Sequence, residues 1–272
     1  MAQIPHRDEI HHRIESVTWQ EKDRMYLGMS SIGHPCDRYL FYIFHWAFHR
    51  QIYAKQKRLF NRGNVEELIV IADLAAANIH VVLQQDEVTD QTGHIRGHID
   101  GIITGIPGIY PDMKLLLEVK TMNDKFFKAY KKKKLPDAEP AYYAQMNQYM
   151  GYKNLSKCLF VVTNKNTEER DYTVYDFDKT NFLDYQRRST HLLMLDHIPE
   201  RIGNSTWFEC KFCDARQICH FKHPLRQHCR TCKYIEIHNK GIWKCGVTAH
   251  NLNFAEQQKG CEYWSQSATL VD

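Results

Sequence analysis

The hairpin predicted for residues 97–120 constrains this chain most, because it places charged side chains in a strand pair that is otherwise aliphatic. The sequence there is GHIDGIITGIPGIYPDMKLLLEVK, in which a central Pro-Gly pair marks a turn between two apolar runs. With the turn centred near Ile109, antiparallel pairing matches residues whose numbers sum to about 218. That register sets Asp100 opposite Glu118, with Cβ atoms roughly 5 Å apart.

The second strand of the hairpin has two different faces. Aliphatic residues on one face alternate with a set on the other that ends in an acid and a base, namely Leu115, Leu117 and Val119 against Leu116, Glu118 and Lys120. Two facing carboxylates repel each other unless a proton or a divalent cation lies between them. Because Mg²⁺ and Mn²⁺ take such oxygen ligands, the sequence predicts a site for either ion at Asp100 and Glu118, with Lys120 beside the metal-bound water.

Length and composition predict a well-packed protein. A chain of 272 residues with 43% hydrophobic content supports one large domain or two. No apolar stretch approaches the roughly 20 residues that span a bilayer, and the N-terminal MAQIPHRDEIHH lacks the apolar core of a signal peptide. We therefore expect a cytoplasmic protein that does not contact a membrane, with nine cysteines present as thiols or metal ligands.

The net charge of +4 does not by itself indicate a nucleic-acid-binding protein, but the charge is unevenly distributed. Residues 125–134 read KFFKAYKKKK, directly after the acid-x-lysine strand. Cations interleaved with aromatic residues suit phosphate contact and base stacking. The alternative is a solvated helix end.

Periodicity predicts an α/β fold with a helical N-terminal part. Residues 8–80 read as mainly helical, with an amphipathic run over 58–79 that a turn or cap at 61–64 opens. The elements expected after this part are strands at 81–88, 93–104 and 115–120 in meander order, a helix at 140–152, strands at 157–164 and 171–177, and a helix at 181–195.

Seven of the nine cysteines lie between Cys210 and Cys261 and form two clusters. The second cluster is self-sufficient, because four thiolates on short knuckles flanking a hairpin make a tetrahedral zinc site. Its members are Cys229, Cys232, Cys245 and Cys261, with His228, His238 and His250 as substitute ligands.

The first cluster, Cys210, Cys213 and Cys219, is one ligand short of a closed site. Cys158 lies in the apolar KCLFVVTN and is expected to be a small core residue. Cys36, on a polar loop before a helix, is the better fourth ligand. The set would tie the two ends of the chain around an iron–sulfur cluster or a zinc ion.

Four motifs in this order resemble one family. They are GHIDG with Asp100, LEVK with Glu118 and Lys120, QMNQY with Gln145 and Tyr149, and one early cysteine with three late ones. The chain resembles a PD-(D/E)XK nuclease of the RecB-like branch, and is similar to iron–sulfur exonucleases such as the AddB nuclease domain and the CRISPR-adaptation exonucleases. The resemblance covers residues 36–219.

The resemblance implies a restriction-endonuclease-like core, in which a mixed central sheet is flanked by helices, and a metal-dependent DNA exonuclease activity. It implies that Asp100, Glu118 and the Val119 carbonyl bind Mg²⁺ or Mn²⁺, and that Lys120 orients or activates the attacking water. Gln145 and Tyr149, at i and i+4 on one helix face, would reach the site and the DNA strand. The four ligands of a [4Fe–4S] cluster would be Cys36, Cys210, Cys213 and Cys219.

One position departs from the family pattern, and two further residues are competing candidates for the site. Where these exonucleases place a histidine in an RGxxxH motif, this chain has Glu67, which we expect to be the third metal ligand, with Glu66 as the alternative. His98, two residues before Asp100, is a further candidate for phosphate or metal contact. Asp112 forms the "PD" of Pro-Asp, but it lies near the turn, about 20 Å of strand from Glu118 at roughly 3.3 Å per residue.

The expected organisation is therefore a helical part with one cluster cysteine (1–80), a nuclease core with the cluster-closing segment (81–225) and a zinc module (226–272). If the chain is phage-encoded, the expected location is the cytoplasm of the host. The expected partners are DNA and a recombination or replication protein. Two alternatives remain: an inactive iron–sulfur and zinc module for DNA binding or assembly, and an electron-transfer or redox-sensing protein.

Overall fold

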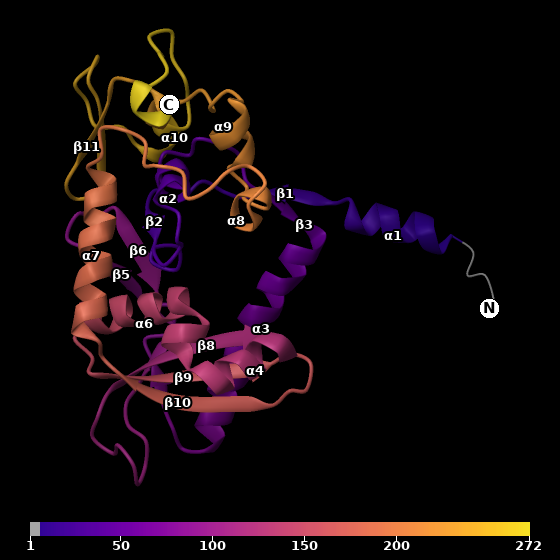
Figure 1. Ribbon diagram of the computed structural model, residues 1–272. Coiled ribbons are helices and arrows are strands. Elements are labelled where there is room, and N and C mark those ends of the chain that lie inside the picture. Colours follow the sequence, from indigo (N-terminus) through magenta and orange to yellow (C-terminus); the bar gives the residue numbers. More distant parts are fainter. Residues whose placement is uncertain (1–5) are drawn as a thin grey trace.

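The computed structural model, which describes residues 6–272, contains a five-stranded mixed sheet that lies in the lower part of Figure 1. Across the sheet the strands are β10 (Arg170–Asp176), β9 (Lys157–Asn164), β8 (Leu115–Met122), β7 (Gly101–Ile103) and β4 (Val81–Val82). Strands β8 and β9 run parallel, and the other pairs are antiparallel. The expectation that the N-terminal MAQIPHRDEIHH is not a signal peptide concerns in part residues 1–5, which lie outside the described part.

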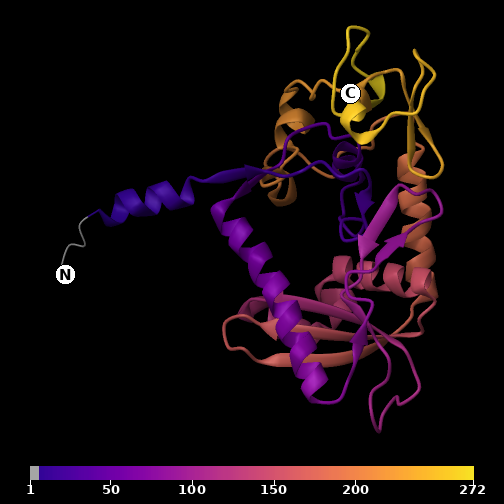
Figure 2. The same cartoon turned by 180° about the vertical axis from the view of Figure 1, so that it is seen from behind.

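Helices cover both faces of this sheet, as Figure 2 shows for α3 (Ala54–Ala76). The crossover from β8 to β9 supplies the opposite layer through α4 (Asp124–Lys133), α5 (Leu135–Ala138) and α6 (Pro140–Lys153). The predicted alternation of β8 is confirmed. Leu115, Leu117 and Val119 pack with Val70 and Leu74 of α3, while Leu116 joins the core formed with α6.

The predicted hairpin register is also confirmed. Gly101 pairs with Leu117, and Ile102 pairs with Leu116. Asp100, the residue before Gly101, lies at a bend of the chain. From this bend the Asp100 side chain can reach β8.

The strands predicted at 81–88 and 93–104 are wrong in detail, because each one is divided between two sheets. The first becomes β4 and β5 (Glu87–Thr89), interrupted by Leu83 and Gln85, whose positive φ angles of 53° and 56° are incompatible with a strand. The second becomes β6 (Ile95–His98) and β7, and β6 lies between β5 and β2 (Leu27–Gly28) in a three-stranded sheet.

The N-terminal part is less helical than predicted. It contains α1 (Arg7–Glu15), α2 (Asp37–Phe44) and α3, but also a two-stranded sheet of β1 (Thr18–Gln20) and β3 (Gln51–Tyr53). The turn predicted at 61–64 is wrong, because α3 continues through it. Burial of the sheet-facing side of α3 outweighs the modest helix-weakening effect of Gly63.

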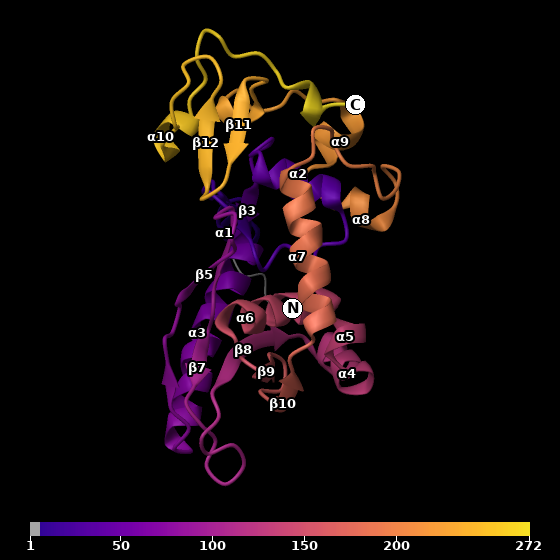
Figure 3. The ribbon, with the colours of Figure 1, turned by 90° about the vertical axis from the view of Figure 1, so that its left-hand side faces the viewer.

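Helix α7 (Lys179–Leu193) connects the sheet to the cysteine-rich C-terminal region (Figure 3). That region contains α8 (Phe208–Lys211), α9 (Arg216–Phe221), the short 3₁₀ helix η1 (Cys229–Thr231), β11 (Ile235–His238), β12 (Ile242–Cys245), α10 (Phe254–Gln257) and η2 (Ala268–Leu270). The hairpin predicted between Cys232 and Cys245 is present as β11 and β12. One core contains residues from Leu27 to Leu270 and therefore draws on all three predicted segments. Among the described residues, no helix is long and apolar enough to cross a membrane.

Candidate active site

A groove of about 690 Å³ lies where the N-terminal part faces one end of β8. Its first wall is the segment 21–31, continued by side chains such as Trp46 and Arg50. Its second wall is the middle of α3, including Phe60 and Glu67. Asp100, Val119, Lys120 and Tyr142 form its floor. We call this space the central groove.

The structure brings Asp100, Glu118 and Lys120 together at this floor. Asp100 Oδ2 accepts a hydrogen bond of 2.7 Å from the Val119 amide, which fixes its carboxylate against β8. Glu118, the residue before Val119 on β8, is fully buried and does not itself line the groove. Its Oε1 atom is 2.5 Å from Lys120 Nζ, but among residues 6–272 neither carboxylate oxygen has a hydrogen-bond partner of acceptable geometry. A buried carboxylate in this state is costly unless a proton or a further cation compensates it.

Burial is the largest single influence on the pKa of each of the three groups. It raises the pKa of Glu118 to about 7, an effect that Lys120 opposes and Asp100 increases. Burial likewise raises the pKa of Asp100, against the lowering effects of Lys120 and the Val119 amide. Burial opposes the charged form of Lys120, but the charges of Glu118 and Asp100 outweigh it and raise the pKa of that amine. Lys120 is therefore an ammonium ion at neutral pH.

The two neighbouring acids on α3 occupy different surroundings. Glu67 lines the groove, and its pKa is raised first by burial and then by the charge of Asp100. Glu66 is instead buried on the sheet side, where its Oε1 atom accepts hydrogen bonds from Arg170 (2.9 Å) and Thr163 (2.8 Å). Glu67, not Glu66, is therefore placed to contribute an oxygen to the groove.

Gln145 and Tyr149 lie on the face of α6 that is buried, with 6% and 2% of their surfaces exposed. Gln145 Nε2 is 3.4 Å from the Tyr149 hydroxyl, and neither residue is among those that line the central groove. Tyr142, one turn earlier on the same helix, does line it and stacks beneath Lys120, whose Nζ atom is 5.1 Å from the ring centroid. Sequence reasoning missed Tyr142, although its helical spacing from Gln145 was available.

The other acidic and basic candidates lie away from the groove. His98 is exposed, with Nε2 4.0 Å from Glu87, and Asp112 is exposed near the turn. The lysine-rich run forms α4, in which Phe127 and Tyr130 pack into the core. Of the aromatic residues in that run, only Phe126 is exposed, so the base stacking predicted for the whole run is wrong for the other two.

The first cysteine set meets at one small cavity. Its four members from distant parts of the sequence, Cys36, Cys210, Cys213 and Cys219, line the same space. Cys36 caps the N-terminus of α2, where its Sγ atom accepts from the Tyr39 amide. Burial raises the pKa of the Cys36 thiol, and the nearby thiols of Cys219 and Cys210 raise it further. Cys158 is buried in the core, as predicted.

The second cysteine set also lines one cavity, formed by Cys229, Cys232, Cys245 and Cys261. Burial raises the pKa of the Cys229 thiol to about 11, and the other three thiols add to this effect. His228 is not available as a substitute ligand, because Nε2 contacts the Trp46 carbonyl at 2.9 Å and Nδ1 accepts from the Arg230 amide at 3.2 Å. Four soft thiol donors match zinc. Within residues 6–272, however, no three His, Cys, Asp or Glu side chains stand as a preformed metal-ligand set.

Comparisons with known proteins give weak, partial likeness. No protein-family model matches the chain, and no curated protein matches it in sequence. The solved structure of SSO0001 aligns with 79% of this chain and 94% of its own, at 18% identity and a TM-score of 0.44. An alkaline exonuclease from Laribacter hongkongensis aligns with 63% of this chain and 87% of its own, at 16% identity and a TM-score of 0.47.

A phage-related exonuclease from Haemophilus somnus aligns with 64% of this chain and 92% of its own, at 13% identity and a TM-score of 0.44. At these TM-scores and identities, the similarities assign neither a family nor an activity to this chain.

Proposed function

We propose that this chain is a metal-dependent DNA exonuclease of the PD-(D/E)XK type, which hydrolyses phosphodiester bonds at the floor of the central groove. The observation that carries the proposal is the state of Glu118. Its carboxylate is fully buried beside Asp100, and in the described chain it has no hydrogen-bond partner of acceptable geometry. A divalent cation would satisfy both carboxylates at once.

The residues present fit such an ion. Asp100, Glu118 and Glu67 offer hard oxygen donors of the kind that Mg²⁺ and Mn²⁺ prefer, and the Val119 carbonyl is the backbone oxygen proposed to join them. When bound, the ion would supply Lewis-acid polarisation of the phosphate and a lowered pKa for water. Lys120, held as an ammonium ion, would orient the attacking water and stabilise negative charge on the phosphate.

The walls of the central groove suit a nucleic-acid strand. Lys22 and Arg24 line the first wall and offer cations for phosphate contacts, whereas Arg50 on the same wall is paired with Glu21 at 2.6 Å and Asp214 at 3.1 Å. Phe60 lines the second wall with 52% of its surface exposed, which is suited to stacking against a base. These features support single-stranded DNA or DNA ends as substrate. The sequence resemblance supports an exonuclease with a role in recombination or DNA processing, acting in the cytoplasm.

The two cysteine sets complete the proposal. Cys36, Cys210, Cys213 and Cys219 would hold a [4Fe–4S] cluster that joins the N-terminal part to the region after α7, and Cys229, Cys232, Cys245 and Cys261 would hold Zn²⁺. Support comes from the donor chemistry and from the shared cavity that each set lines.

The test compares end-labelled linear and circular single-stranded DNA, incubated with Mg²⁺ or Mn²⁺ and three proteins. The proteins are the wild type, Glu118→Gln, which keeps the side-chain shape, and Asp112→Asn as an exposed acid outside the groove. We expect the wild type and Asp112→Asn to shorten linear DNA and leave circles intact, with Glu118→Gln inactive. Cutting of circles would reveal an endonuclease, and binding of DNA without cutting in either metal would favour a binding or assembly module.

A further inference from the structure

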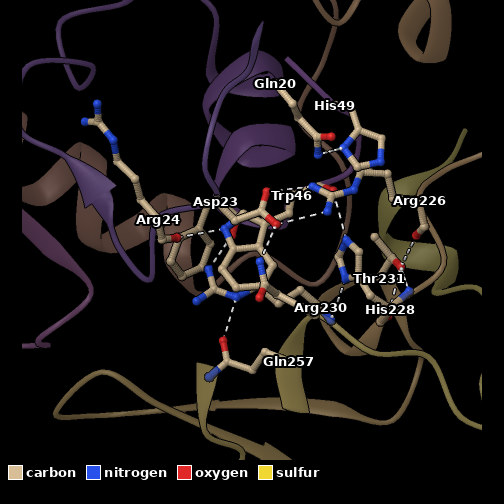
Figure 4. Close-up of polar contacts among 12 residues, drawn as sticks. Gln20, Asp23, Arg24, Trp46, His49, Arg226, His228, Arg230, Thr231 and Gln257 are labelled. Carbon is tan, nitrogen blue, oxygen red and sulfur yellow. Dashed lines mark hydrogen bonds and ion pairs between the residues drawn. The ribbon is translucent and has the colours of Figure 1, made fainter. Parts of the chain in front are cut away.

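The first wall of the central groove is attached to the C-terminal cysteine region, as Figure 4 shows for the contacts around Trp46. Arg226 makes a two-pronged ion pair with Asp23, with Nη1 to Oδ1 at 2.6 Å and Nη2 to Oδ2 at 2.9 Å. Both side chains are largely buried. Asp23 is one of the residues that line the groove, so this pair links a groove residue to a position three residues before Cys229.

Arg230 makes a second connection to the same wall. It lies between Cys229 and Cys232 and is fully buried. Its guanidinium is sandwiched between the rings of Trp46 and Trp243, with Cζ 3.7 Å and 4.1 Å from the two centroids. This stacking fixes the plane of the guanidinium.

The donors of Arg230 reach backbone and amide oxygens, and among the described residues no carboxylate is hydrogen-bonded to them. Nη2 donates to the Met25 carbonyl at 2.9 Å, Nη1 to the Phe44 carbonyl at 2.8 Å, and Nε to Gln257 Oε1 at 2.8 Å. The hydrogen bond to the Met25 carbonyl fixes the position of that backbone relative to the C-terminal region.

Trp46 extends this network along the wall. Its indole Nε1 donates to the Arg24 carbonyl at 2.7 Å, and its own carbonyl accepts from His228 Nε2 at 2.9 Å. Three consecutive residues of the wall, 23–25, are thus held by the C-terminal region either directly or through Trp46. The neighbouring Arg24 and Tyr26 side chains line the groove.

We propose that Arg226 and Arg230 are positioning residues, which hold the wall segment 21–31 in the conformation that binds an oligonucleotide in the central groove. Neither arginine needs to touch DNA. The inference rests on the proposed function, because it assigns the cysteine region a role in substrate binding at that same groove.

The test measures two properties of each variant. Amide hydrogen exchange of residues 21–31 reports the order of the wall, and fluorescence anisotropy with a labelled single-stranded oligonucleotide in EDTA reports binding without cleavage. The variants are Arg226→Met and, as a matched control, Lys233→Met, which removes an exposed cation from the same region. We expect Arg226→Met to exchange roughly tenfold faster at 21–31, as for loss of a charged hydrogen-bonded pair, and to bind DNA correspondingly more weakly. Exchange in β8 should not change.

Asp23→Asn breaks the same ion pair from the other side with little change of shape, and it decides the matter if Arg226→Met does not fold. The inference would be overturned if residues 21–31 of a folded Arg226→Met or Asp23→Asn variant exchanged at the rate of the Lys233→Met control. If the wild type still bound DNA, that result would leave the proposed function standing. A wild type that binds no oligonucleotide would instead contradict the proposed function and, with it, the role assigned to the wall.

Discussion

Lys120 Nζ lies 2.5 Å from Glu118 Oε1, two residues earlier on the same strand. Lys120 Nζ also lies over the ring of Tyr142 on α6, so the ammonium group occupies one side of the carboxylate that we propose as a metal ligand. Its charge partly compensates a buried acid pair that would otherwise repel. A divalent cation at Asp100 and Glu118 would take over this compensation and free Lys120 for the substrate.

The buried Glu118 should make stability depend on pH in the metal-free protein. Because its pKa is about 7 in the folded state and near 4.5 when unfolded, the folded state binds the extra proton, and stability falls as pH rises from about 4.5 to about 7. Glu118→Gln cannot ionise, so we expect it to be more stable than wild type at pH 8 by ~3 kcal/mol, with little difference at pH 4. Urea denaturation in EDTA measures this, and an equal pH dependence in both proteins would contradict the assignment.

Replacing Lys120 should separate catalysis from metal binding. We expect Lys120→Met to lower kcat by roughly 100-fold or more, since it removes a charge that stabilises the transition state. Its affinity for Mn²⁺ should be unchanged or higher, because the ammonium no longer competes at Glu118. Lys114→Met, which changes a lysine just before β8 that does not line the groove, is the control. Loss of Mn²⁺ binding in Lys120→Met would show that the lysine is needed to hold the acids in place.

The adjacent acids of α3 should give opposite phenotypes. Glu67→Ala should weaken Mn²⁺ binding and leave thermal stability nearly unchanged, because Glu67 faces the groove. Glu66→Ala should cost ~2 kcal/mol of stability, because it removes the buried hydrogen bonds from Arg170 and Thr163, although Arg170 keeps its ion pair with Asp73. Calorimetric metal titration and thermal melts of both variants test this pair. The reverse pattern would move the ligand role to Glu66.

The second cysteine set should control the groove wall through its metal. Cys261 is the exposed member of the set, so Cys261→Ser removes a proposed ligand without altering the arginines. We expect elemental analysis to give less zinc per chain than in wild type, with faster hydrogen exchange at 21–31. Glu262→Gln changes the next residue, which is also exposed, and serves as the control with wild-type zinc content. Unchanged zinc content in Cys261→Ser would remove that thiol from the ligand set.

The local sequence pattern was enough to predict that Asp100 and Glu118 lie close together. Alternation along β8 separates its two faces, and the predicted antiparallel pairing of β7 with β8 brings Asp100 close to Glu118. The cysteine spacing likewise predicted which thiols share a cavity.

Contacts between distant segments were not predictable in the same way. The first wall of the groove is contacted by Arg226 and Arg230, which lie about 200 residues along the chain from Asp23 and Met25. The orientation of α6 places Tyr142 rather than Gln145 at the groove, although both lie on one helix. Gly63 suggested a turn, but packing of α3 on the sheet maintains the helix.

Binding of Mn²⁺ in the absence of DNA tests the central claim most directly, because the claim is that the buried Glu118 carboxylate holds a catalytic ion. Isothermal titration at pH 8 compares the wild type with Glu118→Gln and Asp112→Asn. We predict that the wild type and Asp112→Asn bind Mn²⁺ alike and that Glu118→Gln does not. Equal affinity in all three proteins would contradict the account.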